Sequence, residues 1–159
     1  QTNTLTLTSS SFARDGLIPP AYTCDAENKS PQLSLSGVPE GARSLALVMD
    51  DPDIPDSVKQ SRGIEVFVHW VVFDMPPETA EIIEGQEPEG VLGNNSAGKS
   101  GYTGPCPPDR EHRYFFKIYA LDIMLELPEE ARSKQDIERA MAGHILARGE
   151  LMGRYERQR

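Results

Sequence analysis

Two histidines and a carboxylate-rich turn are the residues of this 159-residue chain best suited to chemistry. Asp51 and Asp53 lie in the run Asp-Asp-Pro-Asp-Ile-Pro, directly after an apolar segment. His69 interrupts an apolar run, and His112 opens an aromatic one that continues through Tyr114. Imidazoles and a phenol can donate hydrogen bonds to an anion, while carboxylates orient the imidazoles. The sequence therefore predicts a polar site that receives a small anionic group.

Each of these features also has an ordinary structural explanation. Asp and Pro commonly end strands and form turns, and a single strand histidine is usually a hydrogen-bonded core residue. The same His/Asp set could also coordinate a metal or perform acid–base hydrolysis, but the sequence offers no separate sign of a nucleophile or an activated water. We favour a non-enzymatic binding module with a regulatory role and with no cofactor or metal, and keep a weak His/Asp hydrolase as an alternative.

Three predicted strands must bring these side chains together. Apolar residues dominate 43–50 and 66–73, and the second run, apolar at nearly every position, predicts a strand covered on both faces. The third strand spans 112–121, where a period of two places His112 and Tyr114 on the same face. The turn with the two aspartates follows the first of these strands, so the site is expected beside strand ends.

The remaining segments predict a single β-rich domain over 1–159. Leu5 and Leu7 alternate with threonines over 4–8, which predicts a first strand, and 15–41 is rich in turn residues with one brief strand near its end. Near the C-terminus, a capping-box pattern predicts a helix over 133–148 that Gly149 closes, followed by a short strand over 151–155. No repeat or long linker divides the chain.

Residues 93–100 match the phosphate-loop pattern GxxxxGK[ST] at every position. That loop binds phosphates only when a buried strand precedes it and a helix follows it, because the helix N-terminus supplies aligned amide groups. Here two glycines and three prolines follow at once, over 101–108. We therefore interpret 93–100 as a surface loop and exclude nucleotide hydrolysis.

The net charge of −9 argues against a nucleic acid or an anionic lipid surface as a partner. No apolar stretch approaches the roughly 20 residues of a transmembrane segment, so we expect a soluble protein, either cytoplasmic or periplasmic/secreted. The two cysteines, Cys24 and Cys106, fit no metal-ligand spacing. They are either separate core residues or the two halves of a disulfide.

Taken together, these motifs resemble the phosphatidylethanolamine-binding protein family, which includes the Raf kinase inhibitor protein, and look most like its bacterial branch. The resemblance runs along almost the whole chain. Its segments are 22–25, 30–31, 36–41, the DPDIP motif at 51–55, 68–71, GPCPP at 104–108, HRY at 112–114, 142–144 and 153–155. Ile54 departs from the pattern by replacing a smaller residue within DPDxP, which removes no polar group.

The resemblance implies a mainly β fold of two stacked antiparallel sheets of Greek-key type, with short peripheral helices, one of them near the C-terminus. It also implies a cavity that accepts phosphate, acetate or a phospholipid head group such as phosphoethanolamine. The residues expected to line it are Asp51, Asp53, Pro55, His69, Pro107, Pro108, His112 and Tyr114. Because Cys106 falls in the pocket-wall loop and Cys24 in the long turn segment, a disulfide between them is a further prediction. Family members that inhibit kinases or proteases make such an inhibitor a second alternative function.

Overall fold

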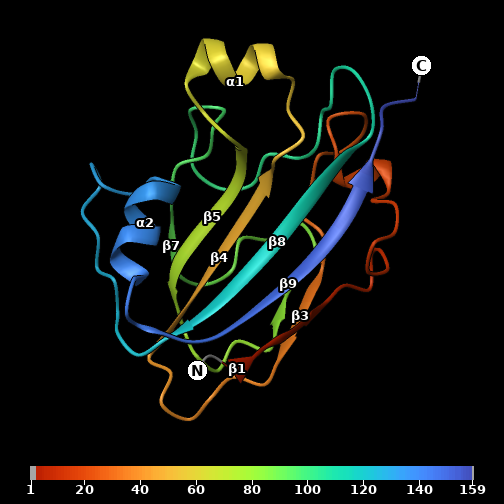
Figure 1. Cartoon of the computed structure of the whole chain (residues 1–159). Coiled ribbons are helices and arrows are strands. Elements are labelled where there is room, and N and C mark those ends of the chain that lie inside the picture. The colour runs from red at the N-terminus through yellow and green to blue at the C-terminus, as the bar shows by residue number, and fades with distance from the viewer. Residues whose placement is uncertain (1–2, 159) are drawn as a thin grey trace.

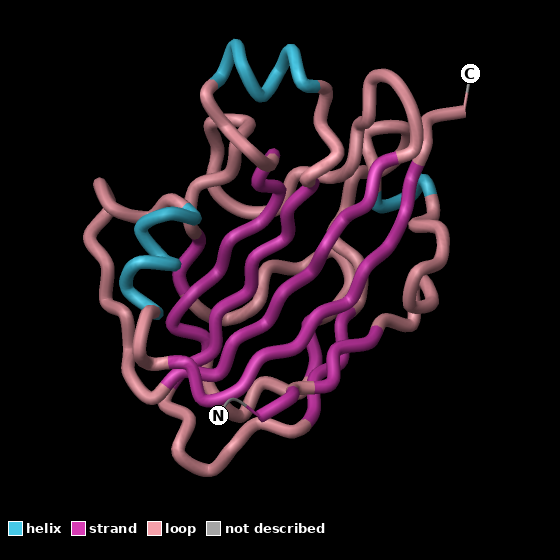
Figure 2. The backbone as a smooth tube through the Cα atoms, viewed as in Figure 1, coloured by secondary structure: helices cyan, strands magenta, loops and turns pink. Residues whose placement is uncertain are grey.

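Two β-sheets form the framework of the computed structural model, which describes residues 3–158 (Figures 1 and 2). In spatial order, the larger sheet contains β1 (Asn3–Thr4), β9 (Ile145–Tyr155), β8 (His112–Leu121), β4 (Ser44–Asp51), β5 (Phe67–Met75) and β7 (Val91–Leu92). The smaller sheet contains β2 (Thr6–Thr8), β3 (Leu33–Ser36) and β6 (Glu81–Ile82). Neighbouring strands run antiparallel, except that β1 lies parallel to β9. The predicted mainly β, two-sheet class is observed.

The main hydrophobic core lies between the two sheets, and β4 shows why. Because successive strand residues point to opposite faces, Leu45 and Leu47 enter this core, whereas Ala46 faces a second apolar cluster on the outer side. The helix α2 (Lys134–Met141) covers that outer side and contributes the fully buried Ile137. The larger sheet is thus buried on both faces over β4 and β5, as the apolar run at 66–73 predicts.

The first predicted strand, 4–8, proves to be two strands in different sheets. β1 pairs with β9, and β2 pairs with β3, so the chain crosses from one sheet to the other within a few residues. Leu5 stands at the crossing: its backbone N–H donates to the carbonyl of Arg148 (2.8 Å), and its side chain is buried in the core. The alternation of apolar residues is as expected, but the segment joins the two layers.

The predicted helix over 133–148 is too long. Its start is correct, because the Ser133 hydroxyl accepts the backbone N–H of Asp136 (3.1 Å) and the Asp136 carboxylate accepts the N–H of Ser133. The helix ends at Met141, two residues before Gly143, whose φ of 83° is left-handed. The predicted strand over 151–155 is only the second half of β9, which pairs with the whole length of β8.

Glycine within β9 has a packing role that the sequence pattern does not reveal. A Cβ atom on Gly149 would lie 2.4 Å from the carbonyl oxygen of Leu5, and one on Gly153 would lie 2.6 Å from Ile18. Both glycines therefore let the N-terminal segments approach the strand closely. The interpretation of Gly149 as the end of a helix was wrong, because Gly149 lies inside β9 and packs against Leu5.

A short helix that the sequence analysis missed, α1 (Asp56–Arg62), stands at one end of the larger sheet (Figure 1). Pro55 is its N-cap residue, and Gly63, at φ 66°, ends it in the left-handed conformation. A single 3₁₀ turn, η1 (Pro20–Tyr22), lies in the long irregular segment. None of the helices in the described part of the chain is long and apolar enough to cross a bilayer.

Residues 93–100 form a turn in which Asn94 and Ser100 make an isolated β-bridge. Figure 2 shows loop rather than helix directly after β7, and the next helix of the described chain, α2, begins only at Lys134. This geometry differs from that of a phosphate loop, which needs a helix immediately after its glycines.

Candidate functional site

Three strands bring the polar residues of the sequence to one cavity of about 250 Å³. Asp51 ends β4, His112 begins β8, and His69 lies near the start of β5. The rings of His69 and Tyr114 meet edge to face, with centroids 5.3 Å apart. The lining residues are Asp51, Ile54, Pro55, Val58, Arg62, Phe67, His69, Thr103, Gly104, Cys106, Pro107, Pro108, His112 and Tyr114. Seven of the eight predicted pocket residues are among them, and Asp53 is not.

His69 reaches the cavity because the pairing of β4 and β5 is irregular at this point. Met49 pairs with Trp70 and Asp50 pairs with Val68, so His69 is an extra residue on its strand. Such a bulge redirects a side chain and breaks the simple alternation of faces. Trp70 points into the core between the sheets. Alternation alone would therefore point His69 to the other face, the outer side of the sheet.

Burial and a backbone carbonyl hold His69 neutral. Its Nδ1 lies 2.8 Å from the carbonyl oxygen of Thr103, which can only accept, so Nδ1 carries the proton. The Thr103 backbone N–H donates in return to the carbonyl of His69 (2.9 Å). Burial lowers the pKa of the His69 imidazole to about 4. At neutral pH the Nε2 atom of His69 is therefore a hydrogen-bond acceptor.

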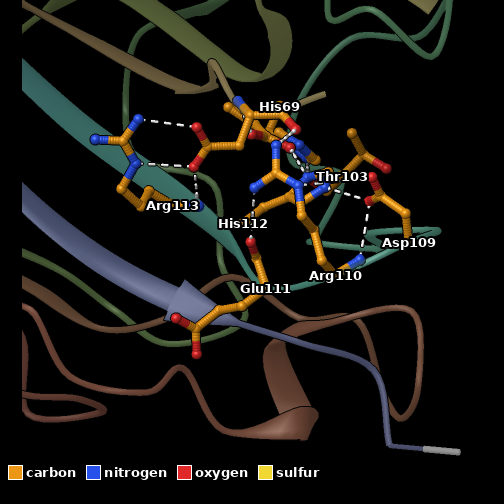
Figure 3. Close-up of polar contacts among 9 residues, drawn as sticks. His69, Thr103, Asp109, Arg110, Glu111, His112 and Arg113 are labelled. Carbon is orange, nitrogen blue, oxygen red and sulfur yellow. Dashed lines mark hydrogen bonds and ion pairs between the residues drawn. The ribbon is translucent and has the colours of Figure 1, made fainter. Parts of the chain in front are cut away.

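His112 is buried between two carboxylates. Its Nδ1 lies 2.6 Å from Oδ2 of Asp51, and its Nε2 lies 2.7 Å from Oδ1 of Asp109. Both contacts are hydrogen bonds at once when the ring carries two protons, and Figure 3 shows Asp109 on one side of His112 and Arg113 on the other. The hydrogen bond from His112 keeps the pKa of Asp109 below its ordinary value. Burial raises the pKa of Asp51 despite the neighbouring imidazole.

Asp51 also stabilises the turn that follows β4. Its Oδ1 accepts the backbone N–H of Asp53 at 2.7 Å, a side-chain to backbone bond typical of Asp in turns. The structural and the functional explanations of the aspartate-rich motif therefore apply to the same carboxylate. One oxygen of Asp51 fixes the backbone, and the other orients the imidazole of His112.

The Tyr114 hydroxyl has no hydrogen-bond partner, the single case among buried side-chain polar atoms of residues 3–158. The side chain is fully buried and lines the cavity. Burial raises its pKa well above the ordinary tyrosine value, so the hydroxyl keeps its proton. A buried hydroxyl without a partner costs free energy, on the order of 1–3 kcal/mol. Because Tyr114 lines the cavity, this hydroxyl is a buried donor at the cavity wall without an acceptor in the described part of the protein.

Comparison with known proteins now identifies the family. The model of the phosphatidylethanolamine-binding protein family matches residues 8–156. The chain belongs to this family. A UPF0098 protein of Methanothermobacter thermautotrophicus is 46% identical over 159 residues, covering 96% of this chain and 99% of that protein. A UPF0098 protein of Chlamydia trachomatis is 44% identical over 151 residues, covering 95% and 98%. Similar sequences thus occur in archaea as well as in bacteria.

Solved structures of the family share the fold of this chain. A putative phosphatidylethanolamine-binding protein homologue of Chlamydia trachomatis superimposes with a TM-score of 0.91 at 43% identity, covering 99% of this chain and 100% of that one. The Escherichia coli protein YbcL gives 0.83 at 28% identity, covering 97% and 99%. A carboxypeptidase Y inhibitor complexed with its cognate proteinase gives 0.54 at 18% identity, a likeness of fold alone.

In this phosphatidylethanolamine-binding protein family member, Asp53 turns away from the cavity. Its carboxylate forms two hydrogen bonds with the Arg113 guanidinium, both 2.8 Å long, and accepts the backbone N–H of Arg113 (2.9 Å). The bonds from Arg113 lower the pKa of Asp53 to about 2. Figure 3 shows Arg113 extended on the side of His112 opposite Asp109. The motif thus supplies one carboxylate to the cavity and one to an outer ion pair.

The wall of the cavity is cross-linked. Cys106 is joined to Cys24 by a disulfide with an S–S distance of 2.00 Å, and both Cys106 and the neighbouring Pro107 line the cavity. Because proline fixes φ, this wall can change little in backbone conformation. The bond connects the pocket loop to the long turn segment, as the positions of the two cysteines led us to expect.

Sequence reasoning missed Arg62, Phe67, Thr103 and Asp109 at the site. Arg62 lies at the end of α1 with its guanidinium 5.5 Å from the Phe67 ring centroid. Pro55 before and Gly63 after this helix are start and stop signals that could have revealed it. Thr103 acts through its backbone carbonyl, for which side-chain identity gives no signal. Among residues 3–158, no group of three or more His, Cys, Asp or Glu side chains is arranged to hold a metal ion.

Proposed function

We propose that this chain is a non-enzymatic module that binds a small anionic group in the cavity and serves a regulatory role. The carrying observation is the unpartnered, fully buried hydroxyl of Tyr114 on the cavity wall. Nearly all buried polar groups in proteins have partners, so an exception on a cavity wall favours a ligand that completes it. Phosphate, acetate and a phosphoethanolamine-like head group all carry the acceptor oxygens that this hydroxyl needs.

The other donors around the cavity support an anion. The Arg62 guanidinium has five N–H groups, and one of them donates to the carbonyl of Ser96 (2.7 Å). Other N–H groups of Arg62 can therefore donate to an anion. The Nε2 of His112 is a further donor once its present acceptor moves. The two carboxylates of the aspartate-rich motif are already bonded within the protein, Asp51 to His112 and Asp53 to Arg113. An acidic protein can therefore still present hydrogen-bond donors to an anion at this cavity.

The volume of the cavity limits the ligand. About 250 Å³ lies just below the range of roughly 300–1,000 Å³ that is typical of sites for drug-sized molecules. A phosphate or acetate ion, or the terminal group of a larger molecule, suits this space. A whole phospholipid would have to leave its acyl chains outside.

Titration with inorganic phosphate, followed by NMR of the histidine and tyrosine rings, tests the proposal. Signals of His112 and Tyr114 should move together and saturate in the millimolar range or below. Tyr114→Phe should weaken binding about tenfold, because it removes one hydrogen bond to a charged group. Tyr119→Phe on the same strand is the matched control, since Tyr119 does not line the cavity. Unchanged ring signals at millimolar phosphate contradict the proposal.

Parallel titrations separate the sources of the anionic group. Acetate, inorganic phosphate and O-phosphoethanolamine share the acceptor chemistry but differ in charge and size. Tighter binding of O-phosphoethanolamine than of phosphate would favour a head-group ligand, which sedimentation with phosphatidylethanolamine vesicles then checks. Equal binding of the two favours free phosphate, because the amine then makes no contact of its own.

The two alternative functions make different predictions for the same protein. For a weak hydrolase, the specific observation is the His112 imidazole oriented by a buried carboxylate, an arrangement also found in general bases. Release of phosphate from phosphomonoesters, lost in His112→Ala, would favour it over simple binding. A protease or kinase inhibitor acting through the cavity face would instead capture a stoichiometric protein partner from the native organism, and would lose it on addition of phosphate.

A further inference from the structure

Asp109 occupies the hydrogen-bonding position of His112 that an anionic ligand would use. The other ring nitrogen, Nδ1, is committed to Asp51, whose side chain is 4% exposed. Nε2 is therefore the only nitrogen of His112 that a ligand can reach. In this structure, a carboxylate oxygen of Asp109 lies 2.7 Å from it. A carboxylate oxygen accepts the same hydrogen bond as an oxygen of phosphate or acetate.

We propose that Asp109 is a resident competitor that must leave His112 before an anion binds, and that it thereby sets the affinity of the cavity. This inference rests on the proposed anion-binding function and specifies its regulation. A single Nε2–H group makes one strong, linear hydrogen bond, so the two acceptors exclude each other. A charged Asp109 beside the cavity would also repel an incoming anion.

The position of Asp109 in the chain allows the exchange. Its side chain is 40% exposed, whereas that of His112 is 1% exposed. The carboxylate can therefore rotate into solvent, where water replaces both His112 and the backbone N–H of Arg110 (2.9 Å), while the imidazole stays fixed. The Arg110 guanidinium lies 3.8 Å from the second carboxylate oxygen and can receive the displaced charge. Pro107 and Pro108 stiffen the backbone before this point, which confines the movement to the few residues before β8.

Occupancy of the cavity would then be visible at the protein surface. Arg110 also donates to the carbonyl oxygen of Asp53 (3.2 Å), which belongs to the turn on the other side of the site. When Asp109 leaves His112, the charges presented by residues 109–111 rearrange without any change in the strands. A partner that contacts this loop could distinguish the occupied from the empty state.

Variants of Asp109 test the competition with inorganic phosphate as the probe. Asp109→Ala removes the competing acceptor and its charge, so it should tighten phosphate binding about tenfold, the change that 1.4 kcal/mol produces. Asp109→Asn keeps a neutral acceptor and should fall between wild type and Asp109→Ala. Glu111→Gln is the matched control: it removes one negative charge two residues away, from a side chain that pairs with Arg154 at 3.0 Å rather than with His112.

The outcomes separate this inference from the proposed function. Wild-type binding that Asp109→Ala leaves unchanged, or that Glu111→Gln tightens equally, overturns the competition while preserving the anion site. Phosphate binding by none of the variants overturns the anion site and the competition with it. The ligand-free protein provides an independent check: the Nε2 signal of His112 should shift in Asp109→Ala and stay in place in Glu111→Gln. No shift in Asp109→Ala means that the contact is absent.

Discussion

The two ends of β8 carry chemically identical pairs in opposite surroundings. At the start of the strand, Nδ1 of His112 lies 2.6 Å from Asp51, and the two side chains are 1% and 4% exposed. Just beyond its other end, Nδ1 of His144 lies 2.8 Å from Asp122, and those side chains are 41% and 43% exposed. The residue types are the same and the distances hardly differ. Burial, together with the second carboxylate that contacts His112, that of Asp109, separates the candidate site from an ordinary surface contact.

Burial changes what such a pair costs and what it can do. In water, an imidazole and a carboxylate gain little by pairing, whereas in the interior each loses solvation that only the partner and further hydrogen bonds can replace. Asp51 has that support from His112 and from the N–H of Asp53. Because burying the two groups costs solvation free energy, the pair is weak evidence for a stabilising role. We therefore favour the interpretation that it serves the cavity.

Removal of one carboxylate from each pair should produce the largest contrast. Asp51→Ala leaves a buried imidazole nitrogen and a turn N–H without their acceptor, so we expect a loss of about 4 kcal/mol in the free energy of unfolding. Asp122→Ala should cost less than about 1 kcal/mol, because water replaces the lost contact. Urea unfolding of both variants measures the difference. Equal losses would show that burial does not distinguish the two ends.

The difference between the two ends could be predicted only in part from the sequence. The period of two in β8 correctly placed His112 and Tyr114 on one face, and the aspartate-rich turn correctly followed β4. The residue pattern is sufficient to predict such placements, because side chains alternate between the two faces along any single strand. It also gave a helix start at Ser133, where two side chains satisfy the first turn.

What escaped prediction depends on contacts between distant segments. His69 enters the cavity through a pairing irregularity between β4 and β5, which no single-strand pattern encodes. Asp53 belongs to the same motif as Asp51, yet the neighbouring Arg113 draws it to the outside. The end of α2 was missed because β9 competes for the residues after Gly143 by pairing with β8.

A pH titration sharpens the comparison at the cavity end, with a smaller effect. His69 has a folded pKa of about 4, below its ordinary value of 6.5, because burial disfavours its charged form. The unfolded chain then binds the proton more readily between these values, so stability falls as pH decreases from 6.5 toward 4. Between pH 7 and pH 5 the loss should be about 2 kcal/mol.

The variant His69→Asn isolates this contribution, because its amide can still donate to the carbonyl of Thr103 without titrating. Urea unfolding at several pH values should show a shallower loss in His69→Asn than in wild type. His144→Gln at the exposed end should retain the full loss. A loss that persists unchanged in His69→Asn would mean that another group produces it.

The ion pair of Asp53 and Arg113 stands between the two extremes and should have the smallest of the three effects. The Asp53 side chain is 13% exposed and that of Arg113 is 52% exposed. The depressed pKa of Asp53, about 2, means that the pair contributes stability above pH 3.8 and loses it as pH falls toward 2. Solvent around Arg113 screens the interaction, so we expect about 1 kcal/mol at neutral pH.

A double-mutant cycle with Asp53→Asn and Arg113→Gln measures this coupling without the side effects of either substitution. A value near 1 kcal/mol that is mostly lost at pH 2 would place the pair between the buried and the exposed His–Asp contacts. A coupling energy this small matters for function, because the charge of Asp53 could then be removed with little loss in the free energy of unfolding. Phosphate affinity should stay within about twofold in Asp53→Asn, since the carboxylate points away from the cavity. A large change in affinity would instead return Asp53 to the binding site.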